Sequence, residues 1–201
     1  MLDLLIHISF AIFYISLGYE IIYVNIPSVV STKKIFSLNN GDTEYFSEKT
    51  EQIFKWSKTK KIIVFVLPLI VTYILYLLPL LYHLDMLEPL YTNSSMAYLG
   101  VVLVIVGRII NILFIHQAKR KRINNVLITE GIFKFSRNPC QTGLYISLIG
   151  LNLIYPSLIY IVCFITYAIS IHFRIIMEEE YLEKKFKKDY ILYKSKTRRY
   201  L

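Results

Sequence analysis

Four stretches of this chain are long, apolar and almost free of charge, which restricts what it can fold into. They are residues 4–30, 62–82, 97–115 and 139–173. Glu20 and Arg108 carry the only formal charges in them, and His7 and His172 are their only histidines. A helix needs about 20 residues to cross the hydrocarbon core of a bilayer, which is about 30 Å thick. We therefore predict an integral membrane protein, in keeping with a hydrophobic content of 55% and a charged content of 18%.

The last of these stretches is too long for a single span. Pro156 divides it and Pro139 begins it, and proline is best tolerated in the first turn of a helix because it lacks a backbone N–H. Asn138 is a suitable N-cap for the first part. We predict two spans, 139–155 and 156–173, which form a helical hairpin.

The spanning elements are predicted to be helices. Within lipid every backbone polar group needs an internal partner, which leaves helices and closed barrels. The chain lacks the alternating segments of about ten residues that build a barrel. The predicted fold is all-α, a polytopic membrane helical bundle in which residues 1–201 form a single membrane domain. The five predicted spans are residues 4–30, 62–82, 97–115, 139–155 and 156–173.

Beyond the last span, large apolar residues recur every three or four positions, as on one face of a helix. They are Met177, Tyr181, Leu182, Phe186, Tyr190 and Tyr193. We predict a C-terminal cytoplasmic amphipathic helix that continues from the last span. Its aromatic stripe would pack against the cytoplasmic ends of the other helices.

The basic residues lie on one side of this predicted bundle. Lys and Arg number seven in residues 31–61, six in 116–138 and nine in 174–201, and Arg108 completes the total of 23. Cytoplasmic loops are enriched in Lys and Arg, so the N-terminus is predicted outside and the C-terminus in the cytoplasm. The net charge of +9 lies beside the spans, where anionic lipid headgroups attract it. Membrane lipids are the expected partners, and no nucleic acid is expected.

The two cysteines, Cys140 and Cys163, both lie in the predicted hairpin. Their spacing fits neither a set of metal ligands nor a disulfide framework. We therefore expect no metal site.

One motif precedes the predicted hairpin and a second follows it. The first reads Leu-Ile-Thr-Glu-Gly-Ile-Phe-Lys-Phe-Ser-Arg-Asn-Pro-Cys-Gln-Thr-Gly over residues 127–143. The second consists of Glu178-Glu179, Leu182, Phe186, Tyr190, Tyr193 and Arg198 or Arg199. In this order, around one helical hairpin, they resemble the isoprenylcysteine carboxyl methyltransferase and phospholipid methyltransferase families of integral membrane enzymes. The resemblance covers residues 117–201.

The resemblance implies methyl transfer from S-adenosyl-L-methionine (SAM) in a cytoplasm-facing pocket between the hairpin ends and the tail helix. Residues 117–201 would be the cofactor-binding half. Arg174 would face the substrate and Glu178 would contact the cofactor, and both are predicted to be catalytic. The other predicted cofactor-binding residues are Gln117, Leu127, Ile128, Phe133, Arg137, Asn138, Pro139, Cys140, Gln141 and Glu179.

The chain departs from the family pattern at four of these aligned positions. Asn138 replaces a histidine, Gln141 and Phe133 each replace a tyrosine, and Lys187 replaces a glycine. The Arg-Asn-Pro form is familiar among bacterial relatives, so a bacterial inner membrane is the expected location. The departure at Asn138 weakens the choice of substrate more than the choice of enzyme class.

The residue chemistry can be weighed independently of the resemblance. A hairpin would bring residues 137–139 and 174–179 to the same membrane face. Arg174 and Glu178, four positions apart, would be neighbours on a helix. A carboxylate beside the positively charged sulfonium of SAM is physically reasonable, because buried charges need partners. No G-x-G-x-x-G motif after a strand is present, so a soluble dinucleotide fold is not indicated.

Glu20 and Arg108 are charged residues within predicted spans, where ionisable groups are costly and usually face the bundle interior. They can pair with each other. Alternatively, Arg108 extends its side chain toward the headgroups.

Three functions remain open from the sequence. The first is a SAM-dependent integral membrane methyltransferase whose acceptor is a lipid, a prenylated compound or another hydrophobic small molecule. The second is a membrane oxidoreductase that resembles the sterol and steroid reductases and uses NADPH. The third is a non-catalytic membrane subunit, which the departures at Gln141 and Phe133 keep open.

Overall fold

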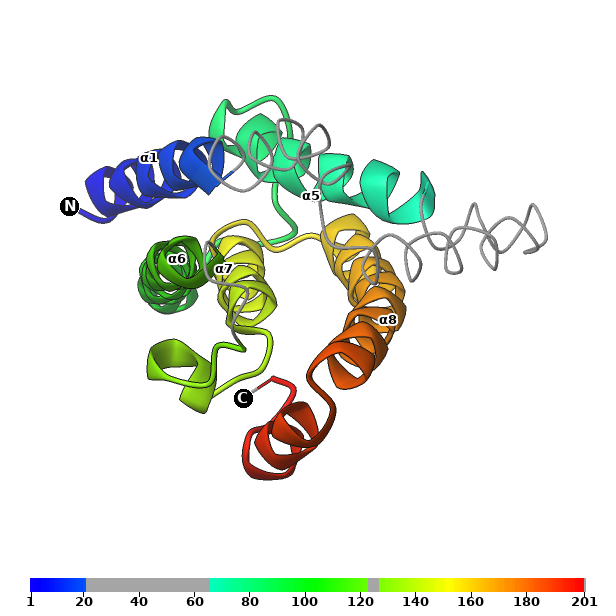
Figure 1. Ribbon diagram of the computed structural model, residues 1–201. Helices are drawn as coiled ribbons and strands as arrows, with labels where there is room; N and C mark the ends of the chain where they lie inside the picture. The colour runs from blue at the N-terminus through cyan, green and yellow to red at the C-terminus, as the bar shows by residue number, and fades with distance from the viewer. Residues whose placement is uncertain (21–65, 123–126, 201) are drawn as a thin grey trace.

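A computed structural model describes residues 1–20, 66–122 and 127–200, without the side chains of residues 119–122. The described residues form five α-helices and one 3-10 helix, and they contain no strand. The elements are α1 (Leu2–Glu20), α5 (Leu67–His83), α6 (Ser94–Arg122), η3 (Gly131–Lys134), α7 (Pro139–Ile154) and α8 (Leu158–Lys196). The predicted all-α class is therefore confirmed for this part of the chain (Figure 1).

Helices α6 and α7 form the closest pair of the bundle, and α1 also packs on α6. Glycines lie where the backbones of α6 and α7 touch. A Cβ added at Gly100 would stand 2.6 Å from the carbonyl oxygen of Gly150, and one at Gly150 would stand 2.6 Å from that of Gly100. Small residues permit such close approach between helices in membranes.

Helix α8 packs mainly on α5, although it follows α7 directly in the sequence. Figure 1 shows α8 standing apart from α7, with the chain turning between them at residues 155–157. Long side chains bridge the space: Gln141 Nε2 donates to Tyr167 Oη (3.2 Å), and the Tyr145 hydroxyl donates to the carbonyl oxygen of Ala168 (3.5 Å). The hairpin arms are therefore adjacent in sequence but contact each other through only a few large side chains.

Helix α8 continues well past its apolar part, to Lys196. Lys187 interrupts the helical geometry with φ of 46° and ψ of −118°. Of the predicted stripe, Tyr190 and Tyr193 are buried, while the four residues before the break are half-buried. The predicted continuation of the last helix is thus present, and the amphipathic character of the tail stays a prediction.

Three helices are long and apolar enough to cross a membrane, namely Leu2–Glu20, Ser94–Ala118 and Leu158–Lys196. Helix α5 has 17 residues and α7 has 16, which at 1.5 Å per residue is about 24 Å for α7. Residues 21–30 and 62–65, which belong to predicted spans, lie outside the described residues. The count of five spans therefore stays a prediction.

The start of α7 agrees with the sequence in one respect and differs in another. Pro139 lies in the first turn, as predicted. Asn138 holds the N-cap position, but its side chain makes no capping hydrogen bond. Its Nδ2 instead donates to the carbonyl oxygen of Arg199 (3.3 Å). The amide group is thus used to hold the C-terminal residues.

The start of α8 also differs from the prediction. Pro156 was expected in the first turn, but the helix begins at Leu158 with Ser157 as the N-cap. The Ser157 hydroxyl accepts a hydrogen bond from the backbone N–H of Tyr160, as serine does at helix starts. Pro156 instead belongs to the turn, where its carbonyl oxygen accepts from Leu90 N (2.9 Å).

Candidate functional site

The loop before α7 lies against the last residues of the described chain. The backbone N–H of Arg137 donates to the carbonyl oxygen of Arg198 (2.8 Å), and that of Asn138 donates to the carbonyl oxygen of Arg199 (3.2 Å). The Ser136 hydroxyl also donates to the Arg199 carbonyl oxygen (3.2 Å). These bonds join the predicted cofactor motif to the C-terminus, about 60 positions later in the chain.

Glu179 links these two segments through its carboxylate. Arg137 donates to Oε1 from Nε (3.2 Å) and Nη2 (3.0 Å), and Arg199 donates from Nε to Oε1 (3.0 Å) and from Nη2 to Oε2 (2.9 Å). The third nitrogen of Arg137, Nη1, donates to the carbonyl oxygens of Lys194 and Thr197. The Glu179 and Arg137 side chains are only 5% and 9% exposed.

The electrostatics of this cluster favour the charged carboxylate. Burial by itself raises the pKa of Glu179, but the hydrogen bonds and charges of Arg199 and Arg137 outweigh it and hold that pKa below its ordinary value. Hydrogen bonding to Glu179 in turn raises the pKa of Arg199. The cluster is therefore an ionised clamp on the tail, with little capacity left to contact a ligand.

Arg174 and Glu178 form a pair of a different kind. Arg174 Nε donates to Glu178 Oε1 at 3.2 Å, in the predicted i and i+4 relation, and the side chains are 66% and 56% exposed. Exposed pairs of this type contribute about 0.3–0.5 kcal/mol. Both groups are therefore available for a ligand.

The 3-10 helix η3 fixes the position of the first motif. Gln117 Oε1 accepts from the backbone N–H of Ile132 (3.1 Å). Gly131 has φ of 61° and faces the end of the Gln117 side chain, which would have to move for a Cβ, so this position favours glycine. The Phe133 ring packs on Phe114, and its carbonyl oxygen accepts from Tyr193 Oη (2.7 Å).

The first turn of α7 connects the candidate site with the rest of the bundle. Cys140 Sγ donates to Glu20 Oε1 (3.2 Å), and Gln141 donates to Tyr167 Oη on α8. Pro139 is buried, whereas Leu127 and Ile128 are half-buried. The predicted site residues thus lie along the loop 127–138, the start of α7 and the α8 segment 174–179, with Gln117 on α6.

Beneath this region, Arg108 and Glu20 form the ion pair that the sequence suggested. Arg108 Nη2 donates to Glu20 Oε2 (2.9 Å), and Nε donates to Ser16 Oγ (2.6 Å). The Arg108 side chain is fully buried, so the alternative of a side chain that extends to the headgroups is excluded. Asn111 completes the cluster. In the amide orientation that satisfies both of its polar atoms, the nitrogen donates to the Cys140 carbonyl oxygen (2.9 Å) and the oxygen accepts from Arg108 Nη1 (3.1 Å).

Comparison with known protein families gives a match to part of the chain. The family model "Phospholipid methyltransferase" matches residues 95–189. This part of the chain, slightly under half of its 201 residues, is similar to the phospholipid methyltransferase family. No curated protein and no solved structure matches the chain.

The phospholipid methyltransferase match begins in α6 and ends two residues after the break at Lys187. It contains the first motif, the predicted hairpin and the second motif as far as Phe186, and together with the apolar helices it indicates a membrane methyltransferase. It omits α1 and the C-terminal residues that close the Glu179 cluster.

Sequence reasoning left one partner of this cluster undecided and missed others. It named Arg198 or Arg199 as the basic end of the motif, and the structure places Arg199 on Glu179. It did not anticipate the contact of Tyr200 with His172 (3.0 Å). No periodicity or motif signals that contact, because the tail only reaches α8 by turning back along the loop before α7.

Proposed function

We propose that this protein is an integral membrane methyltransferase that uses SAM to methylate a lipid or another hydrophobic acceptor. The observation that carries the proposal is the match of the phospholipid methyltransferase family over the hairpin. The two motifs lie together at the N-terminal end of α7 and in the C-terminal half of α8, joined through Arg137 and Glu179. This end is the predicted cytoplasmic side, where SAM is available.

Some of the predicted site residues can contact SAM, whereas others are already bound to groups within the protein. Glu178 offers an exposed carboxylate, which suits the positive sulfonium, the amino group or the ribose hydroxyls. Arg137 and Glu179 bind each other, Arg199 and backbone carbonyls. We therefore propose that Arg137 and Glu179 hold the walls of the SAM pocket in place, and we do not assign them direct contacts with SAM.

The wall on the α7 side would consist of Asn138, Pro139, Cys140 and Gln141, with Gln117, Leu127, Ile128 and Phe133 above it. Gln141, where the family has tyrosine, still has a polar amide and bonds Tyr167 on α8. It can keep α7 and α8 at a fixed spacing. The donor set is therefore compatible with SAM despite this departure.

SAM would supply a methyl group activated by its positive sulfur. The task of the chain is then alignment and exclusion of water, since in-line displacement needs the acceptor atom and the methyl group at near-attack distance. Arg174 would orient the acceptor by its polar group, and Glu178 would hold the cofactor. The proposal covers O-, N- and S-methylation, because the exposed pair fits the polar group of each acceptor.

Binding of S-adenosylhomocysteine (SAH) to the detergent-purified protein tests the proposal. We expect saturable binding that falls at least tenfold in Glu178→Ala, because the carboxylate that contacts the cofactor is lost. Glu180→Ala removes a neighbouring exposed carboxylate, and this variant should bind SAH normally. Binding of NADPH in place of SAH would overturn the proposal in favour of a reductase. Binding of neither ligand would overturn it in favour of a non-catalytic subunit.

Transfer of labelled methyl groups from SAM to a total membrane lipid extract then identifies the acceptor. Arg174→Ala should lower turnover at least tenfold while SAH binding persists, since Arg174 is assigned to the acceptor. Unchanged turnover would show that this assignment is wrong.

A further inference from the structure

The first turn of α7 is held by two neighbouring helices through the polar atoms of Cys140. Its Sγ donates to Glu20 Oε1 of α1 (3.2 Å), and its carbonyl oxygen accepts from the Asn111 amide nitrogen of α6 (2.9 Å). Arg108 of α6 joins these two partners, because its Nη2 donates to Glu20 (2.9 Å) and its Nη1 donates to Asn111 (3.1 Å). Side chains of α1 and α6 therefore form one connected network that ends on Cys140.

The network lies inside the bundle. Arg108 and Asn111 are both 0% exposed, and the Arg108 guanidinium carbon lies 5.4 Å from the centre of the Phe13 ring. A buried ion pair is often no more stabilising than well-packed apolar residues, and ionisable residues within membrane helices usually mark functional sites. The Glu20–Arg108 pair therefore indicates a role beyond the stability of the bundle.

Glycine gives the network its room between α6 and α7. A Cβ added at Gly143, one turn after Cys140, would stand 2.7 Å from the carbonyl oxygen of Gly107 and would also meet the end of the Asn111 side chain. The Asn111 amide can therefore lie between the two helices and reach the Cys140 carbonyl oxygen. This close contact fixes the start of α7 relative to α6.

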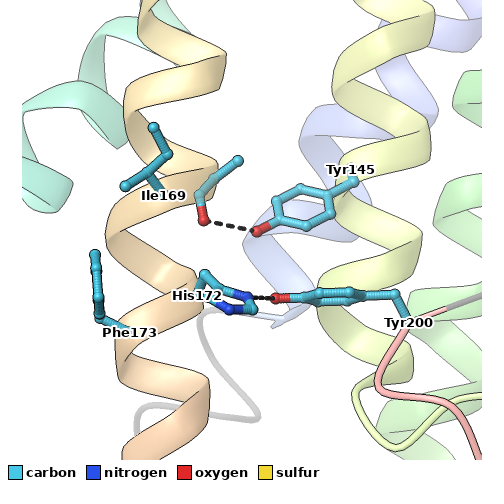
Figure 2. A pocket seen from close by; sticks show the side chains of 6 residues that line it. Tyr145, Ile169, His172, Phe173 and Tyr200 are labelled. Carbon is cyan, nitrogen blue, oxygen red and sulfur yellow. Dashed lines mark hydrogen bonds between the residues drawn. The ribbon is translucent and has the colours of Figure 1, made fainter.

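Helix α8 supports α7 less closely. A groove of about 320 Å³ lies between the two helices, with Tyr145 on one side and His172 and Phe173 on the other (Figure 2). Gln141 and Tyr145 of α7 each bridge to α8 by a hydrogen bond. The position of the first turn of α7 therefore depends on α6 and α1 more than on α8.

Cys140 lies in the wall that is proposed to hold SAM. Asn138, just before it, is bonded to Arg199 in the C-terminal segment, and Gln141, just after it, is bonded to Tyr167 on α8. A shift of Cys140 would therefore disturb its neighbours in the wall as well. Glu20 lies outside residues 95–189, the part of the chain that matches the family model. Helix α1 thus reaches the candidate site from outside the matched part.

We propose that Glu20, Arg108 and Asn111 are positioning residues that hold the first turn of α7, and with it the α7 wall of the cofactor pocket, in the geometry that binds SAM. The inference rests on the proposed function and deepens it, because it makes α1 and a buried ion pair part of the SAM site. The three residues act through Cys140 and need no contact with SAM.

SAH binding to the detergent-purified protein is the first test. Asn111→Ala removes the bond to the Cys140 carbonyl oxygen and keeps both charges, and we expect SAH affinity to fall at least fivefold. Gly100→Ala is the matched control. It disturbs the contact of α6 and α7 at Gly150, about 15 Å along α7 from Cys140, and should change the affinity less than twofold. Equal losses in the two variants would overturn the positioning role.

Two variants of Glu20 separate position from charge. Glu20→Ala removes the acceptor of the Cys140 thiol and should also lower SAH affinity at least fivefold, which provides a second test in case Asn111→Ala does not fold. Glu20→Gln removes the charge but keeps an oxygen that can accept from the thiol, so we expect it to retain at least threefold higher affinity than Glu20→Ala. Equal affinities of the two Glu20 variants would contradict the role of the Cys140 bond.

The reactivity of Cys140 tests the network in the absence of SAM or SAH. In a chain with Cys163→Ser, Cys140 is the remaining thiol. N-ethylmaleimide should label it at least fivefold faster in Asn111→Ala than in Gly100→Ala, because the turn is released while both charges near the thiol remain. Equal labelling rates would overturn the network, and SAH binding by the unaltered protein would still support the proposed function. Failure of the unaltered protein to bind SAH would overturn the proposed function and, with it, the positioning of SAM by this network.

Discussion

Glu178 and Glu179 are adjacent and chemically identical, yet the fold gives them opposite environments. Glu178 points to solvent and pairs with Arg174, one helical turn away. Glu179 is buried and binds two arginines that are distant in sequence, Arg137 and Arg199. Successive helix positions are rotated by about 100°, since a turn has 3.6 residues. One carboxylate is thus available for a ligand while the next secures the tail.

Replacement of Glu179 by glutamine should destabilise the protein strongly. The variant keeps the shape but leaves Arg137 and Arg199 facing each other without a counter-charge. Loss of one partner from a buried pair costs about 3–5 kcal/mol, and we expect about 2–3 kcal/mol because Arg199 is 30% exposed. Chemical unfolding in detergent measures the change, and Glu178→Gln is the matched control with less than about 0.5 kcal/mol. Equal effects of the two variants would contradict the clamp.

The same cluster predicts a pH dependence of stability. Because the pKa of Glu179 is lowered in the folded protein, its contribution is complete above the pKa of an unfolded glutamate, about 4.3. The contribution is lost as the pH falls through the lower, folded pKa. The unfolding midpoint should therefore fall on acidification below about pH 4. The difference between Glu179→Gln and the unaltered protein should shrink over the same range, and a constant difference would rule out this carboxylate as the cause.

Lys187 has a backbone geometry that suits glycine, with φ of 46° and ψ of −118°. A positive φ costs a residue with a side chain about 1–2 kcal/mol. Lys187→Gly should therefore raise the free energy of unfolding by about 1 kcal/mol, after the greater entropy of unfolded glycine is subtracted. Lys184→Gly, on the regular part of α8, should lower it by about 1 kcal/mol. Destabilisation by both substitutions would mean that residue 187 is helical in solution.

At the scale of elements, the antiparallel contact of α6 and α7 depends on two pairs of glycines. Gly100 faces Gly150, and Gly107 faces Gly143, with the members of each helix seven residues apart. Seven residues are close to two turns, so both contacts fall on one face. This spacing is visible in the sequence and could have predicted that α7 packs on α6. Hydropathy alone does not reveal it, because glycine contributes little to hydropathy.

Alanine substitutions at this contact should separate the helices. An added methyl at Gly100 or Gly150 would meet a backbone carbonyl oxygen at 2.6 Å, and backbone cannot move aside as a flexible side chain can. We expect each variant to lose about 2 kcal/mol of stability in detergent unfolding. Gly18→Ala is the control, since no atom of residues 1–20, 66–122 and 127–200 lies within 4 Å of its added Cβ, and it should be neutral or gain up to about 1 kcal/mol. Stability equal to that of Gly18→Ala would contradict the close contact.

At the scale of the whole molecule, the basic residues predict the orientation in the bilayer. The three basic segments would face the cytoplasm, and the loop after α5 would lie outside. Single cysteines placed at Glu88 and at Lys196, both exposed, in a chain without Cys140 and Cys163, test this. An impermeant maleimide added to intact cells should label the first position and spare the second until the cells are opened. The reverse pattern would overturn the orientation.

Patterns within single segments predicted much of the structure. The apolar stretches predicted the helical class and the approximate positions of the helices. Pro139 predicted the start of α7, and two isolated charges within spans predicted the pairing of Glu20 with Arg108. Each of these follows from local composition or from the cost of burying a lone charge. The second arm was less well predicted, since Pro156 stays in the turn and Ser157 caps the helix.

The sequence by itself determined that the chain is a helical membrane protein with two methyltransferase-like motifs on the predicted cytoplasmic side. Hydropathy, charge bias and motif order are properties of the chain that need no coordinates. Only the tertiary structure decided which glutamate is exposed, which arginine closes the clamp and where α7 and α8 leave a groove. These depend on helix rotation and on how far the arms diverge, and both are set by contacts with α6, α5 and the C-terminal residues.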